Sequence, residues 1–276
     1  MDKVVLITGA NSGVGKSLAL QSAMKGSVVV MVCRSKERGE KAKEEIISLS
    51  KNDSVHLIIA DLSSLDSVRN AAGEFRSKFQ KLHILVNNAG INLPERELTI
   101  DGYERVFATN HLAYFYLTSF LLDNLKASVP SRIINVASNA HSAIDINDLM
   151  SEKNYEQYKV YCRSKMANIL FTYELAERLK GTGITVNAVH PGVVKTNIYE
   201  TVHGFPRFMI GLMMPFFISP EKSAERILPL MYSEEFNNVS GKYFINTKEA
   251  KSKKGSYDID VRKKLWAISE TLINKI

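Results

Sequence analysis

The fold of this chain is decided by Thr8-Gly9-Ala10-Asn11-Ser12-Gly13-Val14-Gly15, which joins the apolar run Val4–Thr8 to a segment of helical periodicity. Glycines permit positive φ angles and let the backbone approach a diphosphate closely. The first turn of the helix then offers free N–H groups and the positive end of its dipole to that anion. This strand–turn–helix therefore predicts a dinucleotide site made by Gly9, Asn11, Ser12, Gly13, Val14 and Gly15.

A nucleoside-triphosphate P-loop is the alternative for the same turn, since Gly15-Lys16-Ser17 matches the end of that motif. The P-loop requires a glycine five residues before its second glycine, where this chain has Ala10, and Gly9 is one residue out of register. No later strand ends in an acidic residue with an evident magnesium role except Asp61, which is interpreted differently below. The spacing therefore favours the dinucleotide site.

After this turn, short β-branched runs alternate with helical segments along the chain. The runs are Val4–Thr8, Val28–Cys33, Val55–Ala60, Ile84–Asn87, Arg132–Val136, Thr185–Val189 and Lys242–Ile245. The helical segments are Lys16–Lys25, Lys36–Leu49, Leu65–Phe79, Tyr103–Leu125, Tyr158–Leu179 and Ser223–Tyr232. Strands that are apolar at consecutive positions are typical of a parallel sheet between helical layers.

We therefore predict a single doubly wound α/β domain of Rossmann type over residues 1–276, with about seven mainly parallel strands and helices on both faces. A closed eight-stranded barrel would need one more strand and helix. Two long segments, at about 139–157 and 193–220, interrupt the alternation. Loops that follow the carboxyl ends of strands line the ligand crevice in such sheets, so we expect these two segments to form the substrate walls.

Composition excludes several classes of protein. With 45% hydrophobic and 24% charged residues, the chain can bury a full core. The two cysteines, Cys33 and Cys162, cannot form a disulfide framework, and no Cys/His cluster has zinc-ligand spacing, so we predict no metal site. The first residues lead directly into a strand and leave no room for a signal peptide. We expect reduced thiols and a cytoplasmic location.

The net charge of +7 raises the question of an anionic partner. Eight basic and three acidic residues lie between Lys242 and Lys264, without interleaved aromatic residues that could stack on bases. This pattern favours a solvated loop and tail. A phosphorylated cofactor or a membrane surface comes second, and we predict no nucleic-acid binding.

The end of the second strand determines which dinucleotide is expected. It reads Val32-Cys33-Arg34-Ser35-Lys36, with no carboxylate before Glu37. A carboxylate here would accept from ribose hydroxyls of NAD, whereas Arg34 can bind a 2′-phosphate through two hydrogen bonds. We therefore predict NADP(H); the alternative is that Arg34 merely begins a solvent-facing helix.

The ends of the third and fourth strands carry small or polar residues suited to the same ligand. Asp61, followed by Leu62, is predicted to accept from the adenine amino group, with a helix N-cap as the alternative. The turn of Asn88, Ala89 and Gly90 suits close passage of the cofactor, although an ordinary turn has the same composition.

A candidate reacting group lies at Tyr161 and Lys165, which are four residues apart and so share one helix face. A phenol ionises near pH ~10 when unperturbed, and a neighbouring ammonium favours the phenolate. Tyr161 could then pass a proton to or from a substrate oxygen, while Lys165 also contacts cofactor ribose hydroxyls. Such a pair also arises by chance, so it gains weight only from the residues around it.

Two further polar residues are candidates for the same site. Ser138 follows the fifth strand, where its hydroxyl could orient the substrate oxygen. Asn110 could hold a water beside Lys165, with a helix-distorting buried amide as the alternative. His111, His141 and His190 do not assemble into a nucleophilic triad, and no Gly-x-Ser-x-Gly elbow is present.

Taken in order, these pieces resemble the short-chain dehydrogenase/reductase family from Lys3 to about Ile273. The matching positions are Thr8-Gly9-x-x-x-Gly13-x-Gly15, Asp61, Asn87-Asn88-Ala89-Gly90, Asn110, Ser138, Tyr161-x-x-x-Lys165 and Pro191-Gly192. The resemblance implies that Ser138, Tyr161, Lys165 and Asn110 act together, and that Pro191, Gly192, Val194 and Thr196 hold the nicotinamide end. It also implies dimers or tetramers.

More narrowly, the chain is similar to the retinol dehydrogenase branch. The residues that carry this likeness are Cys33-Arg34, Tyr161–Asn168, His190–Val194 with Thr196, Ser240–Phe244 and Leu265-Trp266 with Ser269-Glu270. The likeness implies NADP(H) and hydride transfer at a lipophilic alcohol, aldehyde or ketone. Many members of that branch begin with a membrane anchor that this sequence lacks, so the implied substrates extend beyond retinoids. A non-catalytic NADP(H)-binding sensor or scaffold is the alternative function.

The second long loop contains the apolar stretch 208–218, which is eleven residues long. A membrane-spanning helix needs ~20 residues, so this stretch cannot cross a bilayer. Its methionines favour a lid over a bulky apolar ligand. A peripheral membrane contact and a buried subunit interface are the two alternatives.

Overall fold

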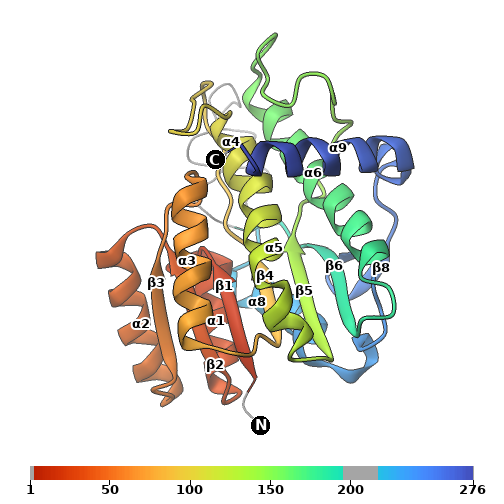
Figure 1. Ribbon diagram of the computed structural model, residues 1–276. Coiled ribbons are helices and arrows are strands. Elements are labelled where there is room, and N and C mark those ends of the chain that lie inside the picture. Colours follow the sequence, from red (N-terminus) through yellow and green to blue (C-terminus); the bar gives the residue numbers. More distant parts are fainter. Residues whose placement is uncertain (1–2, 195–216, 276) are drawn as a thin grey trace.

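The computed structural model describes residues 3–194 and 217–275, and in this part of the chain eight strands form one sheet of order β3-β2-β1-β4-β5-β6-β7-β8 (Figure 1). The strands are β1 Val4–Thr8, β2 Val28–Cys33, β3 Val55–Ile59, β4 Ile84–Asn87, β5 Ser131–Val136, β6 Ile184–His190, β7 Lys242–Ile245 and β8 Lys248–Ala250. The neighbours from β3 through β7 are parallel, and β8 is antiparallel to β7. This confirms the predicted Rossmann-type fold.

Helices cover both faces of the sheet. They are α1 Gly13–Met24, α2 Lys36–Ser50, α3 Leu65–Lys78, α4 Arg105–Phe107, α5 Ala113–Lys126, α6 Gln157–Arg178, α8 Pro220–Tyr232 and α9 Ile259–Ile273. One buried cluster joins the sheet to α1, α2 and α8, and another joins it to α3, α5, α6 and α9. In Figure 1, α9 lies across α5 and α6 on the outer side of the second layer. The apolar strands are thus buried on both sides, as their consecutive apolar residues predict.

The strand order reverses direction at β1, which pairs with β2 on one side and β4 on the other. The connections therefore leave a crevice at the carboxyl ends of β1 and β4, where ligands bind in open α/β sheets. Within residues 3–194 and 217–275, no helix is long and apolar enough to cross a bilayer.

The expected helix Tyr103–Leu125 is wrong as a single element. The structure begins the helix at Arg105 and inserts a π-helical turn, η1 Ala108–Leu112, before α5. The extra residue of a π turn does not alter the apolar character of the segment, so periodicity does not reveal it.

Two C-terminal elements were not predicted from the sequence. β8 is a polar three-residue edge strand, and its short length leaves no apolar run to detect. The other is α9, which begins after the N-cap residue Asp258, whose carboxylate accepts hydrogen bonds from the N–H groups of Asp260 and Val261.

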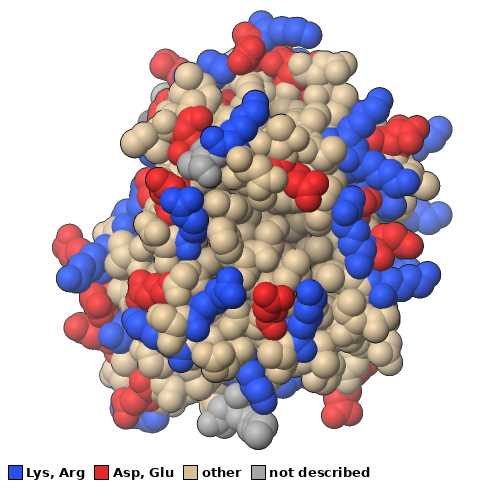
Figure 2. Space-filling model, viewed as in Figure 1, with Lys and Arg blue, Asp and Glu red and all other residues tan. Residues whose placement is uncertain are grey.

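Figure 2 shows that lysines and arginines lie among acidic side chains at the edge formed by β8 and α9. Two of the basic residues in this region are paired: Lys242 with Glu249, and Arg262 with Glu174, each at 2.8 Å. This mixture of charges agrees with a solvated surface.

Arg132 on β5 links the sheet to the end of α8. Its buried guanidinium donates from Nη1 to the Leu230 carbonyl at 2.9 Å, and from Nη2 to the Ser233 carbonyl at 2.7 Å and Asn237 Oδ1 at 2.6 Å. The last carbonyls of a helix lack partners within the helix, and a cation satisfies them well. Ser233 is the C-cap residue of α8, and the Arg132 side chain satisfies the carbonyls around it.

We expect Arg132→Met to lower the free energy of unfolding by about 3 kcal/mol, because one buried and two half-buried acceptors lose a charged donor. Urea unfolding followed by circular dichroism measures this loss. The control is Arg69→Met, which removes an exposed arginine paired with Asp66 and should cost less than about 1 kcal/mol. Equal unfolding midpoints for the two variants would contradict this role of Arg132.

Candidate active site

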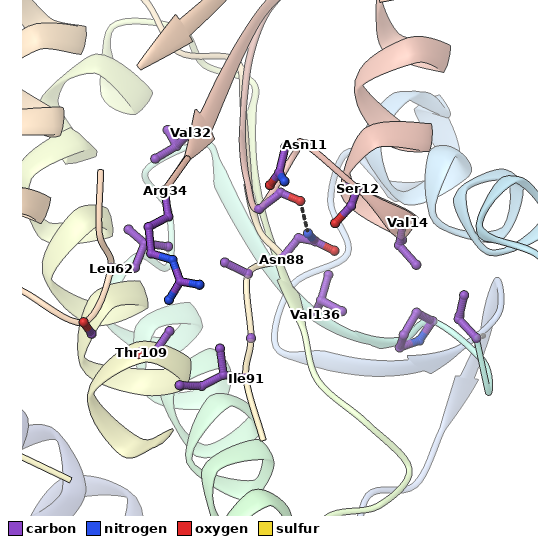
Figure 3. Close-up of a pocket in the computed structure, with 18 of the residues that line it drawn as sticks. Asn11, Ser12, Val14, Val32, Arg34, Leu62, Asn88, Ile91, Thr109 and Val136 are labelled. Carbon is purple, nitrogen blue, oxygen red and sulfur yellow. Dashed lines mark hydrogen bonds between the residues drawn. The ribbon is translucent and has the colours of Figure 1, made fainter. Parts of the chain in front are cut away.

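A cavity of about 500 Å³ opens at the carboxyl ends of the parallel strands. Its walls come from the turn after β1, the ends of β2 to β6, and the beginning of α8, and Figure 3 shows ten of the lining residues by name. The structure brings together nearly all of the predicted site residues here. They are Gly9, Asn11, Ser12, Gly13, Val14, Gly15, Arg34, Asp61, Leu62, Asn88, Ala89, Gly90, Ser138, Tyr161, Lys165, Pro191, Gly192 and Val194.

The glycine turn has the geometry expected of a phosphate cradle. Gly9 and Gly13 have φ angles of +66° and +53°, which favour glycine. A Cβ on Gly15 would lie 2.3 Å from the Gly9 carbonyl oxygen and 2.6 Å from Asn88 Nδ2. Ser12 caps α1 without a side-chain hydrogen bond, which leaves the first N–H groups of α1 available to a ligand. The turn can therefore hold an anion against backbone donors.

The turn after β4 is fastened to the glycine turn. Thr8 Oγ1 accepts from the N–H groups of Asn88 at 2.9 Å and Ala89 at 3.0 Å, and Asn88 Nδ2 donates to the Thr8 carbonyl at 2.8 Å. Figure 3 shows the Asn88 amide directed at the glycine turn. These bonds fix the two turns as one wall of the cleft.

The lysine that a P-loop would aim at phosphates points elsewhere in this structure. Lys16 Nζ lies 2.6 Å from Glu45 Oε2 on α2, and Lys16 is not among the residues that line the cleft. This geometry disfavours the P-loop alternative.

Two arginines line the adenosine end of the cleft. Arg34 precedes α2, whose N-cap is Ser35, and Arg38 follows in the first turn of α2. Neither arginine forms an ion pair with any other described residue. Figure 3 shows Arg34 reaching into the cleft beside Leu62. Arg38 was not predicted from the sequence, although it lies in the first turn of the helix that follows Arg34.

Asp61 is not the N-cap of α3, so that alternative is wrong. Its Oδ1 accepts from the N–H of Ser63 at 2.9 Å and from Ser63 Oγ at 2.8 Å, while Ser64 caps the helix by accepting from the N–H of Ser67. Ile91, Arg105 and Thr109, which line this end of the cleft, were not predicted from the sequence. Thr109 Oγ1 is buried without a hydrogen-bond partner among the described residues. Its position beside Asn110 in the chain was the signal that could have identified it.

Lys165 lies at the other end of the cleft, buried against β5. Its Nζ donates to the Val136 carbonyl at 3.0 Å and lies 5.7 Å from the centre of the Tyr161 ring. Burial lowers the pKa of Lys165 to about 8. A Cβ on Gly90 would lie 3.3 Å from this ammonium, so the small residue leaves room for the lysine. The predicted Tyr–Lys pair therefore shares the cleft wall.

Ser138 follows β5 and lines the cleft together with Tyr161. Its Oγ accepts from the N–H of Ala140 at 3.0 Å. Among the described residues its hydroxyl hydrogen has no acceptor, so it can be donated to a substrate oxygen.

Asn110 does not line the cleft; it is fully buried in the π turn. Its Oδ1 accepts from the N–H of Ile91 at 2.8 Å, and its Nδ2 donates to the Ile91 carbonyl at 3.0 Å and to Ser164 Oγ at 2.9 Å. This is the helix-distorting buried amide of the alternative interpretation. Asn110 thus connects Ile91, which lines the cleft, to the turn of α6 that carries Lys165. That Asn110 holds a water beside Lys165 stays a prediction.

The turn after β6 forms the last wall. Gly192 has φ +95°, and the Pro191 carbonyl accepts from Ser223 Oγ on α8 at 2.7 Å. Val194 pairs with Ile218 in an isolated parallel bridge. Thr196 and all but two residues of the apolar stretch 208–218 lie outside the described residues, so their predicted roles are not placed.

The three histidines of interest are kept neutral but do not activate a serine. Burial lowers the pKa of His111 to about 3 and that of His190 to about 4, and it also lowers the pKa of His141. Ser269 Oγ lies 2.8 Å from His111 Nε2 but donates its hydrogen to the Leu265 carbonyl, and His141 contacts the main-chain oxygen of Ser138 rather than its hydroxyl. Among the described residues this arrangement does not support a nucleophilic triad.

Comparisons with known proteins agree on one family. A sequence model of short chain dehydrogenases matches residues 3–204. Human retinol dehydrogenase 13 is 41% identical over 279 residues, covering 98% of this chain and 84% of the relative. Retinol dehydrogenase 12 of Bos taurus is 40% identical over 274 residues, covering 98% and 86%.

Solved structures give the same result. An uncharacterized protein from Mycobacterium Paratuberculosis superposes with a TM-score of 0.80 at 29% identity, covering 99% of this chain and 93% of that one. The Pseudomonas aeruginosa RhlG/NADP active-site complex gives 0.72 at 26%, covering 88% and 94%. The 3-ketoacyl-(acyl-carrier-protein) reductase from Brucella melitensis complexed with NADH gives 0.70 at 28%, covering 88% and 96%.

Proposed function

The chain belongs to the short-chain dehydrogenase family of oxidoreductases, and we propose that it transfers hydride between NADP(H) and a lipophilic alcohol or carbonyl. Retinal-like compounds and other hydrophobic aldehydes or ketones form the proposed substrate class. The observation that carries the proposal is that Ser138, Tyr161 and Lys165 line one cleft with the glycine turn. This arrangement can hold a dinucleotide and handle a proton at a substrate oxygen.

The cleft residues fit a nicotinamide dinucleotide. The free N–H groups of α1 suit the diphosphate, and Gly15 lets the first turn of α1 pack directly against the Gly9 main chain. Thr109 Oγ1 is a buried hydroxyl without a hydrogen-bond partner among the described residues. Arg34 and Arg38 would bind the 2′-phosphate that distinguishes NADP from NAD, because guanidinium groups bind phosphate through paired hydrogen bonds. When bound, the nicotinamide supplies or accepts the hydride.

The protein's own groups handle the oxygen and the proton. Ser138 donates its hydroxyl hydrogen to the substrate oxygen and orients it, and Tyr161 donates the phenolic proton to that oxygen in the direction of reduction. Lys165 holds a positive charge near the Tyr161 ring, which favours the negative oxygen that proton donation leaves behind. In the direction of oxidation, Tyr161 accepts the proton of the alcohol.

A lipophilic substrate is supported by the relatives' names. Retinol dehydrogenases 13 and 12 are about two-fifths identical to this chain over nearly its whole length. In loop 139–157, the apolar side chains of Ile144, Ile146, Leu149 and Met150 pack against the core, and none of them is among the residues that line the cleft.

The proposal is tested by following NADPH oxidation against a panel that contains retinal, a steroid ketone, a medium-chain aldehyde and a short polar ketone. We expect turnover with at least one of the hydrophobic carbonyls at a higher kcat/KM than with the polar ketone. NADPH binding without turnover of any panel member would instead favour the non-catalytic sensor.

The pH dependence of reduction should report on Lys165. Because burial lowers its pKa to about 8, the ammonium is lost as the pH rises through that value. We expect kcat/KM for carbonyl reduction to fall above that pH, toward about tenfold per pH unit. In Lys165→Met, the residual kcat/KM should not show this decrease at high pH. A wild-type profile that stays flat to pH 10 would contradict the role of the ammonium.

A further inference from the structure

His141 connects two segments that lie far apart in the sequence. Its Nδ1 lies 2.8 Å from the Ser138 carbonyl oxygen, and its Nε2 lies 2.9 Å from the main-chain nitrogen of Lys253. The imidazole is only 2% exposed and packs edge-on against the Tyr243 ring, with 5.5 Å between ring centres. It therefore bridges the turn of Ser138 to the segment after β8.

The two contacts fix one protonation state of the ring. A carbonyl oxygen only accepts, so Nδ1 must carry a hydrogen, and a main-chain N–H only donates, so Nε2 must be unprotonated. The imidazole is thus the neutral Nδ1–H tautomer. Burial and the charge of the nearby Lys253 lower the pKa of His141, and His190 and Tyr243 are further titratable groups that face it.

The segment that holds Lys253 is itself fastened to α6. Ser252 Oγ lies 2.7 Å from the Tyr173 hydroxyl, and the N–H of Ser252 donates to the Tyr257 hydroxyl at 3.1 Å. The Lys253 carbonyl accepts from the N–H of Ser256 at 2.9 Å. This segment lies beyond residue 204, where the match to the family's sequence model ends.

We propose that His141 is a positioning residue, which holds the turn of the substrate-orienting Ser138 against the C-terminal main chain at Lys253. The bridge fixes the Ser138 carbonyl, and with it the direction of the neighbouring hydroxyl. The expected change in kcat rests on the proposed function, whereas the hydrogen-bonded bridge does not. The tautomer of the ring follows from the hydrogen bonds alone.

Lys253 offers a clean test because its N–H can be removed with little other change. Its φ is −62°, close to the angle of about −65° that a proline ring imposes. Its side chain is exposed, and its carbonyl bond to Ser256 survives the substitution. Lys253→Pro therefore deletes the donor to His141, whereas the matched control Lys253→Ala removes the side chain and keeps the N–H.

In steady-state reduction of the best carbonyl of the panel, we expect kcat of Lys253→Pro to fall about tenfold or more below that of Lys253→Ala, because small displacements of an orienting group are costly. KM for NADPH should match that of the control, whereas the melting temperature of Lys253→Pro should be lower because Nε2 of His141 is left unpaired in the interior. Equal kcat values in the two variants would overturn the proposal.

The ring itself provides a second measurement that needs no activity. In protein labelled with ¹⁵N-histidine, the His141 signals are those lost in His141→Gln. At neutral pH we expect a protonated Nδ1 and an unprotonated Nε2 in the wild type and in Lys253→Ala. A proton on Nε2 in the wild type would overturn the bridge. A wild type without reductase activity would count against the proposed function. In that case the protonation of Nδ1 and Nε2 of His141 would still test whether the bridge exists.

Discussion

Replacement of Tyr161 by phenylalanine is expected to lower kcat for carbonyl reduction about a thousandfold, the middle of the range of about 10²–10⁴ for loss of a general acid. The change removes one oxygen from a side chain that lines the cleft beside Ser138 and Lys165. Hydride delivery to a carbonyl leaves negative charge on oxygen, and without the phenol no positioned proton neutralises that charge. Stopped-flow or steady-state NADPH oxidation measures the loss.

The affinity for NADPH should remain close to that of the wild type in Tyr161→Phe, as measured by fluorescence titration, because the diphosphate cradle and the two arginines are unchanged. The matched control is Tyr158→Phe, the same substitution at an exposed position of the same helix that does not line the cleft. Its kcat should equal the wild-type value. Undiminished turnover in Tyr161→Phe would refute the assignment of the proton donor.

The second large effect is expected at the adenosine end. We predict that Arg34→Asp lowers the ratio of kcat/KM for NADPH to that for NADH about a hundredfold. A charged hydrogen bond to phosphate is worth about 1.5–3 kcal/mol, and the new carboxylate also repels the phosphate. The same carboxylate can accept hydrogen bonds from the ribose hydroxyls of NADH, which raises kcat/KM for NADH and so lowers the ratio further.

The control for Arg34→Asp is Lys36→Asp, which makes the same change of charge two residues further on, at an exposed position outside the cleft. It separates a contact with the phosphate from a general effect of surface charge. A ratio that is the same in Arg34→Asp, in Lys36→Asp and in the wild type would rule out Arg34 as the discriminating residue. Arg38→Ala should give a smaller decrease in the same direction.

The fold was largely predictable because local rules determine it. The apolar strands and the glycine turn follow from backbone sterics and burial, and the predicted and observed bounds of β1, β2, β4 and β7 coincide. Features set by tertiary contacts were not predictable. The π turn of Asn110 depends on bonds to Ile91 and Ser164, which lie 19 and 54 residues away.

The same division holds for the candidate site. Residues at strand ends, such as Arg34 and Ser138, could be identified because the carboxyl ends of parallel strands meet at one edge. Arg38 was missed because it lies inside a helix whose other charged residues face solvent. The contact of His141 with Lys253 joins residues 112 positions apart, and no spacing rule relates them.

Transfer of hydride from a nicotinamide to a carbonyl carbon beside Tyr161 can be followed with deuterium. The wild-type protein is incubated with retinal, or the best carbonyl of the panel, and NADPH deuterated at C4 of the nicotinamide on one face or the other. With NADPH deuterated on one of the two faces, we expect mass spectrometry to find deuterium on the carbinol carbon of the product alcohol. Tyr161→Phe should form almost no alcohol. Alcohol without the label from either face, or no alcohol from any carbonyl, would contradict such a transfer.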